Sequence, residues 1–219
     1  AIEILSNETM RQMALPYHII NQNMKEVRML FEYETERLNL KIIKPMHANQ
    51  VLDFYLRDQE LFERFEPDRA EGFYTVGFQK QILSFEYNMA VQGTLFRFYV
   101  YEKTDPKRII GTISFHHIVR GFSNSCEIGY KFSSEVHHRG YATEALTKVL
   151  EVIFYELQLH RVQAWVLPDN APSIRLLERV GFVFEGISRD YLFLHGTWQS
   201  HALYSILPSD LQVSSGHNQ

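Results

Sequence analysis

The chain has 219 residues, a formal net charge of −4 and no Lys/Arg-dense block of five or more, which argues against nucleic acid as a direct partner. Hydrophobic residues make up 45% of the sequence, and 16 Phe and 12 Tyr can fill a sizeable core in one large domain or two small ones. No apolar run approaches the length of a membrane span, so we expect no membrane partner.

The single cysteine, Cys126, cannot form an internal disulfide, which fits a reducing compartment. The first residues lack a basic region followed by an apolar segment, so they do not read as a secretory signal. We therefore expect a cytoplasmic protein. The mildly acidic balance is also compatible with a cationic substrate.

Helical spacing of apolar residues predicts four or five helices, the clearest of them over residues 48–56, 73–91, 141–156 and 172–180. In the second of these helices, one face carries Phe78, Ile82, Phe85 and Met89. Residues 59–71 are charged and broken, so no helix is expected there. Gly181 stands where a glycine commonly ends a helix.

Strands are predicted where apolar residues alternate with polar ones or where β-formers gather, over residues 38–43, 96–101, 109–118, 125–132, 161–167, 182–187, 192–194 and 198–206. The two strands at 109–118 and 125–132 read as an antiparallel pair with a longer connection. No repeat or linker divides the chain. We therefore expect one α+β domain over residues 34–207, an N-terminal extension over 1–33 and a C-terminal tail over 208–219.

One short motif, HHRGYATEA at residues 137–145, follows the strand at 125–132 and runs into a helix. A helix start exposes backbone N–H groups without partners, and its dipole favours anions. Gly140 lets a phosphate approach the backbone, and Arg139 and the two histidines add donors. The motif fits a pyrophosphate cradle, but spacing alone leaves open an ordinary helix start, because short glycine patterns are weak evidence.

The motif belongs to an ordered set that spans about residues 34–207: Glu34-Thr35-Glu36-Arg37-Leu38, Phe65-Glu66-Pro67, Val119-Arg120-Gly121, Ile128-Gly129-Tyr130, HHRGYATEA, Asp169-Asn170-Ala171-Pro172-Ser173, Gly181-Phe182, Glu185-Gly186, Asp190-Tyr191 and Gly196-Thr197-Trp198. With this set the chain resembles the GNAT superfamily of N-acetyltransferases, and more closely its ribosomal-protein-alanine N-acetyltransferase branch of the RimJ/RimL type. Two positions depart from the pattern: His137 replaces Gln or Arg, and Ser200 replaces an Asp of many relatives.

The resemblance implies a single GNAT-type domain with a mixed, mostly antiparallel sheet of about seven strands, splayed at its central strands and flanked by four or five helices. It implies acetyl-CoA as cosubstrate. The pyrophosphate would be bound by backbone N–H groups of His138, Arg139, Gly140, Tyr141, Ala142 and Thr143. The pantetheine arm would pair with the strand that carries Ile128, Tyr130, Lys131 and Phe132, where a backbone N–H would polarise the acetyl carbonyl.

Two further residues receive roles from the resemblance. Asn170 would bind the pantetheine side of the cofactor, and Ser173 would act as general acid toward the departing thiolate. The alternative is that Asp169 or Asn170 caps a helix and that Ser173 is an exposed serine.

A general base is needed because the acceptor amine is mostly protonated near neutral pH. Glu127 is the first candidate, since it precedes Ile128-Gly129 on the strand that would meet the acetyl group; alternatively it faces solvent or an arginine. Glu66 could bind or deprotonate the amine, or be a capping or surface charge. Asp190 is the third candidate. The aromatic side chains Phe65, Phe73 and Tyr74 could wall an acceptor groove.

No metal is expected. His116-His117 and His137-His138 are adjacent pairs, and adjacent side chains on a strand point to opposite faces, which makes poor chelation. Cys126 reads as a buried or half-buried strand cysteine, because it lacks the context that activates a thiol.

We therefore expect an acetyl-CoA-dependent N-acetyltransferase that transfers acetyl directly within a ternary complex. The best candidate acceptor is the N-terminal α-amine of a protein, for instance a ribosomal one. The alternatives are a small amine (a polyamine, an amino acid or an antibiotic) and a CoA-binding sensor or interaction module without turnover. The sequence decides neither the acceptor nor whether the chain is a monomer or a homodimer.

Overall fold

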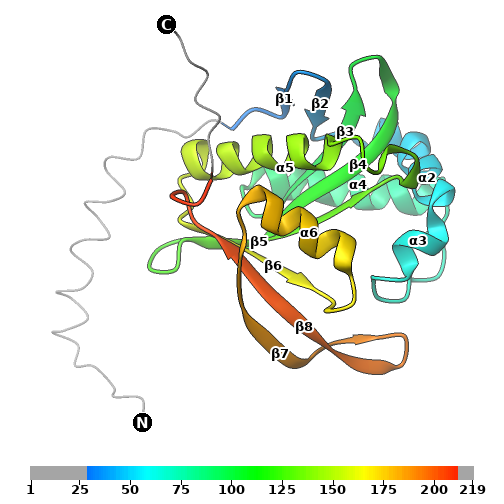
Figure 1. Cartoon of the computed structure of the whole chain (residues 1–219). Coiled ribbons are helices and arrows are strands. Elements are labelled where there is room, and N and C mark those ends of the chain that lie inside the picture. The colour runs from blue at the N-terminus through cyan, green and yellow to red at the C-terminus, as the bar shows by residue number, and fades with distance from the viewer. Residues whose placement is uncertain (1–28, 212–219) are drawn as a thin grey trace, which may run out of the picture.

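An eight-stranded sheet in the order β1-β2-β3-β4-β5-β6-β8-β7 organises the computed structural model, which describes residues 29–211 (Figure 1). Neighbouring strands are antiparallel, except that β5 and β6 are parallel. The strands are β1 (Glu32–Glu34), β2 (Leu38–Lys41), β3 (Phe96–Glu102), β4 (Asp105–Val119), β5 (Ser125–Phe132), β6 (Arg161–Val166), β7 (Val183–Leu194) and β8 (Thr197–Ile206).

This arrangement confirms the α+β class and the mixed, mostly antiparallel sheet. The sheet has eight strands rather than about seven because β1 pairs with β2 at the end of the predicted extension 1–33. The rest of that extension, residues 1–28, and the tail from residue 212 onward lie outside the described residues. Between residues 29 and 211, no helix is long and apolar enough to cross a membrane.

The helical elements are η1 (Pro45–His47), α2 (Ala48–Arg57), α3 (Gln59–Glu63), α4 (Val76–Val91), η2 (Ser134–Val136), α5 (Tyr141–Glu151), η3 (Val152–Glu156) and α6 (Ala171–Val180). The helix predicted over 141–156 keeps its extent, but its last turn, η3, is a π-helix. Helix α3 was not predicted, because its five residues are too few to show a helical period. Gly181 ends α6 with a φ of +109°, as expected.

The helices cover the two faces of the sheet unequally (Figure 1). Helices α5 and α6 pack on one face, where Leu146 and Leu177 join the larger buried cluster. Helices α2, α3 and α4 pack on the other face, in a cluster that takes its strand residues from β3 and β4. We call the two sides of the sheet the α5/α6 face and the α2–α4 face, after the helices that cover them. Exposed aromatic side chains such as Phe193 and Trp198 lie on β7 and β8.

The buried side of α4 lies one residue away from the predicted one. The prediction grouped Phe78, Ile82, Phe85 and Met89 as the apolar side. The structure buries a different set: Gln79, Leu83, Glu86 and Ala90. Phe85 is 59% exposed. The helix was therefore predicted correctly, but its buried side was offset by one residue, so that Phe78 and Ile82 pack against the cluster only partly buried.

The reason lies in the partners of the buried polar side chains. Glu86 accepts hydrogen bonds from Nε of Arg97 at 2.5 Å and from the Tyr99 hydroxyl at 3.0 Å, both on β3. Gln79 donates to the carbonyl of Phe73 at 2.7 Å. A buried carboxylate is tolerated only when it is paired and hydrogen-bonded, and apolar periodicity carries no information about such partners.

Strands β5 and β6 pair over only their first three residues. The last pair joins Glu127 to Gln163. Beyond it, β5 stays paired with β4 as far as Phe132, and β6 stays paired with β8. Two backbone edges therefore face each other across a gap in the middle of the sheet, which is the splay expected at the central strands.

We predict that Glu86→Ala lowers the free energy of unfolding by about 3 kcal/mol, because it leaves the Arg97 guanidinium without its buried partner. Phe85→Ala, one residue earlier on the exposed side of α4, should cost only about 0.5 kcal/mol. Urea denaturation of both variants measures the difference. A larger loss for Phe85→Ala would mean that α4 buries its apolar side after all.

Candidate active site

The gap between β5 and β6 opens into a cleft of about 710 Å³. Its walls come from β5, β6, β8, the α3 region, the start of α5 and α6. Most predicted site residues line it, namely Glu66, Ile128, Tyr130, Lys131, Phe132, His138, Gly140, Tyr141, Ala142, Thr143, Asn170 and Ser173. The fold thus brings residues from four separate motifs to one place.

The start of α5 has the open backbone that the predicted phosphate cradle requires. Gly140 is the N-cap of α5, with a φ of +78°, and a Cβ there would lie 3.5 Å from the Arg37 guanidinium. The backbone N–H of Glu144 donates to the carbonyl of Gly140 at 3.0 Å, and within residues 29–211 it is the first N–H of α5 that has a backbone partner. The amides before it are left for an anion, as at any open helix N-terminus.

Two residues just before β2, Thr35 and Arg37, hold the start of α5 in place. The Glu144 carboxylate accepts hydrogen bonds from the Thr35 hydroxyl at 2.6 Å, and from the backbone N–H and Nε of Arg37 at 2.9 and 2.6 Å. Burial opposes ionisation of Glu144, but these bonds outweigh it and lower the pKa of the carboxyl. Arg37 also donates to the carbonyl of Arg139 at 3.0 Å. The segment Glu34–Leu38 therefore anchors the helix start.

Asn170 and Ser173 meet at the start of α6. Oδ1 of Asn170 accepts a hydrogen bond from the Ser173 N–H at 3.2 Å, so Asn170 caps α6 while it lines the cleft. The Ser173 hydroxyl lies 2.7 Å from the Tyr130 hydroxyl on β5. Burial raises the pKa of Tyr130, so its phenol stays protonated and can donate to Ser173.

Two predicted residues do not line the cleft. The backbone groups of Arg139 already have partners within the protein. Its N–H donates to the carbonyl of Val136 at 3.4 Å, and its carbonyl accepts a hydrogen bond from Arg37. Glu127 lies at the last position of β5 that pairs with β6, two residues before Gly129, which does line the cleft.

Glu66 lies on the α2–α4 face and is paired on both sides, with Arg69 through Oε2 and with Lys131 through Oε1. The Lys131 ammonium lies 5.1 Å from the ring centroid of Tyr55. The side chain of Lys131 thus reaches toward α2 and Glu66. An amine that bound to Glu66 would have to displace one of the two cations.

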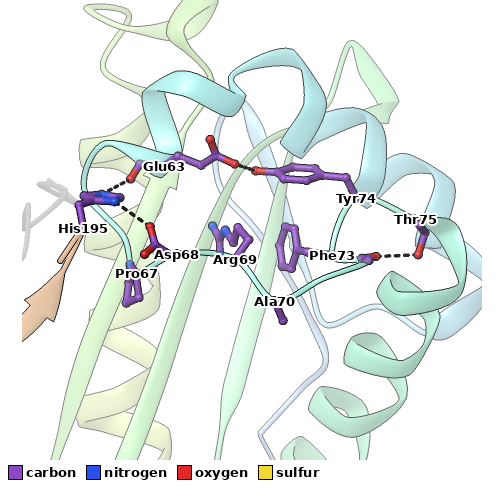
Figure 2. A pocket seen from close by; sticks show the side chains of 10 residues that line it. Glu63, Pro67, Asp68, Arg69, Ala70, Phe73, Tyr74, Thr75 and His195 are labelled. Carbon is purple, nitrogen blue, oxygen red and sulfur yellow. Dashed lines mark hydrogen bonds and ion pairs between the residues drawn. The ribbon is translucent and has the colours of Figure 1, made fainter.

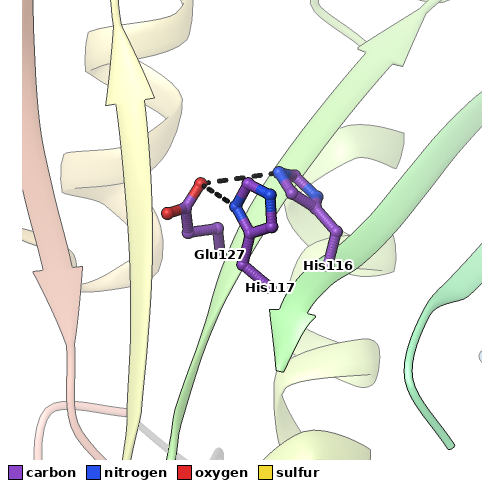
Figure 3. Close-up of side chains that lie close together, drawn as sticks. All are labelled: His116, His117 and Glu127. Atoms are coloured by element: carbon purple, nitrogen blue, oxygen red, sulfur yellow. Dashed lines mark ion pairs between the residues drawn. The ribbon is translucent and has the colours of Figure 1, made fainter. Parts of the chain in front are cut away.

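Glu127 is held by two histidines from β4, as Figure 3 shows. Nδ1 of His117 lies 3.1 Å and Nε2 of His116 lies 3.6 Å from Oε2 of Glu127. The contact with His116, followed by that with His117, outweighs burial and lowers the pKa of Glu127. The carboxyl is therefore ionised near neutral pH.

This geometry corrects the argument that adjacent histidines point to opposite faces. His117 has a φ of +48°, and the β4–β5 register shifts between His116 and Val119. The resulting bulge turns the second imidazole toward the same carboxylate as the first. The strand rule failed here because it holds only for regular strands.

A second cavity, of about 470 Å³, also takes part of its lining from α3, and Figure 2 shows its residues. It is bounded by the loop after α3 and by His195 at the tip of the β7–β8 hairpin. His195 contacts Oδ1 of Asp68 through Nδ1 and the Glu63 carbonyl through Nε2, both at 2.9 Å. Phe73 and Tyr74 line this cavity, whereas Phe65 lines the cleft. The tip of the β7–β8 hairpin therefore contacts α3 and the loop that follows it.

The family model described as "Acetyltransferase (GNAT) domain" matches residues 37–183. The chain belongs to the GNAT acetyltransferase family. It is an acetyl-CoA-dependent N-acetyltransferase, and its cleft, open backbone edge and glycine-capped helix start fit that cosubstrate.

Three similar proteins are informative. The "Probable N-acetyltransferase YjcK" of Bacillus subtilis is 35% identical over 164 residues, which is 74% of this chain and 90% of the relative. The "[Ribosomal protein uS5]-alanine N-acetyltransferase" of Escherichia coli is 32% identical over 177 residues, 80% of this chain and 90% of the relative. The solved structure "Mycobacterium smegmatis RimJ in complex with CoA-disulfide" has a TM-score of 0.74 at 29% identity, and the match covers 80% of this chain and 84% of that one.

Some lining residues of this GNAT acetyltransferase were missed from sequence. They are Leu61, Phe62, Trp165, Leu167, Arg175, Arg179 and His201. Only the two arginines gave a signal, because they are one helical turn apart and follow Ser173. Trp165 stacks on Tyr191 at 4.1 Å between ring centroids, and its indole N–H is buried without an acceptor in the described part of the chain.

Cys126 behaves as expected for a strand cysteine. It is 1% exposed, and burial raises the pKa of its thiol to about 12. The thiol is therefore no nucleophile near neutral pH.

We predict that Ala142→Glu raises the dissociation constant for CoA at least about tenfold, since it places bulk and negative charge in the phosphate cradle. Ala142→Gln, of similar size without the charge, should weaken binding less. Calorimetry measures both, with Gln81→Glu on the exposed side of α4 as the control for added charge. Unchanged affinity in Ala142→Glu would show that the pyrophosphate binds elsewhere.

Proposed function

We propose that this GNAT acetyltransferase transfers acetyl from acetyl-CoA to the N-terminal α-amine of a protein, with a ribosomal protein as the first candidate. The observation that carries the proposal is the similarity to the uS5-alanine N-acetyltransferase over 80% of the chain. The cleft is consistent with it, because the gap between β5 and β6 would let a cofactor bound on one face of the sheet meet an acceptor on the other.

The cofactor would bind on the α5/α6 face. Its pyrophosphate would lie at the start of α5, and its pantetheine arm along the open edge of β5 beside Asn170. Arg175 and Arg179 line the same side and could pair with further phosphate. Transfer would be direct, with rate enhancement from holding amine and thioester close together and from a backbone N–H that polarises the acetyl carbonyl.

The acceptor would approach from the α2–α4 face. Alternation along β5 puts Cys126 and Ile128 in the buried cluster beneath α5, so Glu127 and Lys131 point to the opposite face. The exposed aromatic side chains of the β7–β8 hairpin add apolar surface for a polypeptide rather than for a small amine.

We assign the proton transfers to Glu127 and Ser173. Glu127 would accept the amine proton directly or through one water, since it lies about 7 Å along the strand from Gly129. Its Oε1 has no partner among residues 29–211, because both histidines contact Oε2. Ser173, held by Tyr130, would protonate the departing thiolate. Glu66 would orient the acceptor amine.

An acceptor panel tests the function. Purified protein with acetyl-CoA is offered N-terminal peptides of ribosomal proteins, polyamines, amino acids and aminoglycosides, and free thiol release is recorded. We expect turnover with peptides and none with the same peptides already acetylated at the N-terminus. Turnover only with small amines would replace the proposal by small-amine acetylation, and CoA binding without any turnover would favour a sensor or interaction module.

We predict that Glu127→Gln and Ser173→Ala each lower kcat by about 10²- to 10⁴-fold, because each removes a group that moves a proton in the transition state. The affinity for CoA should stay unchanged, which separates chemistry from binding. Glu32→Gln, on edge strand β1 far from the cleft, is the matched control. If either variant keeps full turnover, the role assigned to that residue is wrong.

A further inference from the structure

The side chains of His116, His117 and Glu127 converge on one point at the β4–β5 junction (Figure 3). Their ligand-type atoms all lie within 4.8 Å of one another. The two nitrogen-to-oxygen distances are 3.6 and 3.1 Å. In a tetrahedral zinc site with bonds of 2.0–2.2 Å, ligand atoms lie about 3.4 Å apart, so little movement would be needed.

A left-handed residue and a bulge in β4 accompany this convergence. His117 adopts a left-handed conformation with a φ of +48°, which is costly for a residue with a Cβ. Its side chain is 72% exposed, so burial does not offset that cost. Backbone strain of this kind persists where a contact or ligand stabilises it.

The other adjacent pair offers a comparison within the same chain. His137 and His138 have ring centroids 6.4 Å apart, and the His137 ring contacts the carbonyl of Phe132. Among residues 29–211, only the cluster at Glu127 assembles three ligand groups. Adjacency of histidines alone therefore does not produce such a cluster; the bulge in β4 does.

The donor set selects the class of ion. Two imidazole nitrogens and one carboxylate suit zinc and neighbouring divalent transition metals, whereas Ca²⁺ and Mg²⁺ prefer oxygen ligands alone. The His116 and His117 side chains are 34% and 72% exposed, so an ion would be reachable from solvent and could keep a water or an acceptor group as its fourth ligand.

We propose that Nε2 of His116, Nδ1 of His117 and the carboxylate of Glu127 bind a divalent transition metal ion, with Zn²⁺ as the best fit. One consequence rests on the proposed function: the ion would occupy the carboxylate assigned as general base, so zinc would inhibit acetyl transfer reversibly. The site itself does not depend on that assignment.

The binding test uses the metal-free full chain without acetyl-CoA. Calorimetric titration with Zn²⁺ should give one ion per chain with a dissociation constant on the order of 1 µM or tighter. Co²⁺ should bind with visible d–d absorption bands. His117→Ala should weaken zinc binding by about 100-fold, since even loss of an outer partner of a metal site commonly costs 10- to 100-fold.

Controls keep the test decisive. His160→Ala removes an exposed histidine outside the cluster and should leave the affinity unchanged. His116→Ala is a second ligand variant in case His117→Ala does not fold, as judged by thermal melting. No saturable binding up to about 100 µM zinc, a hundred times the expected constant, would overturn the site. So would an affinity that neither histidine variant changes.

The inhibition test separates the two proposals. With the acceptor found above, zinc should suppress turnover of the wild-type protein, and a chelator should restore it. In His117→Ala, the ratio of turnover with zinc to turnover without it should return to about one, because the affinity falls out of range. Zinc bound through these histidines with undiminished turnover would support the metal site and overturn Glu127 as the base.

Discussion

The architecture depends on one backbone constraint: β5 and β6 are hydrogen-bonded only as far as Glu127 and Gln163. Buried N–H and C=O groups need partners, and a sheet interior normally supplies them. Here the outer edge of each strand is hydrogen-bonded, that of β5 to β4 and that of β6 to β8. Sliding either strand to close the gap would break that pairing. A ligand with its own amide groups can pair with such an edge, and the pantetheine arm of acetyl-CoA, which we propose binds there, carries such groups.

The gap divides the chemistry between two faces. The α5/α6 face holds a helix start whose open amides and glycine cap suit a pyrophosphate, and it is braced by the contacts of Arg37 with Glu144 and with the carbonyl of Arg139. The α2–α4 face holds the charged side chains, with Glu66 between two cations and Glu127 between two histidines. Under the proposed function, this separation would keep the negatively charged cofactor away from the carboxylates that would meet a cationic amine.

The sequence predicted elements well where the signal was local and regular. The strand at Ser125–Phe132 and the cap at Gly181 were placed correctly, because alternation and glycine geometry act over a few residues. Prediction from the sequence failed where a residue far along the chain determines which way a side chain points. The buried side of α4 follows from the pairing of Glu86 with Arg97 on β3, and the convergence of His116 and His117 follows from a bulge that no pattern marks.

By itself, then, the sequence determined the family and the order of elements, and it pointed to a phosphate-binding helix start, because ordered motifs and helix-start chemistry are written in neighbouring residues. Only the tertiary structure decided which side chains share a face: that Lys131 reaches Glu66 and not the cofactor side, that Tyr130 meets Ser173, and that two histidines meet Glu127. These relations depend on strand register and twist. Register is set by the summed packing and hydrogen bonding of the whole sheet, and no single segment encodes it.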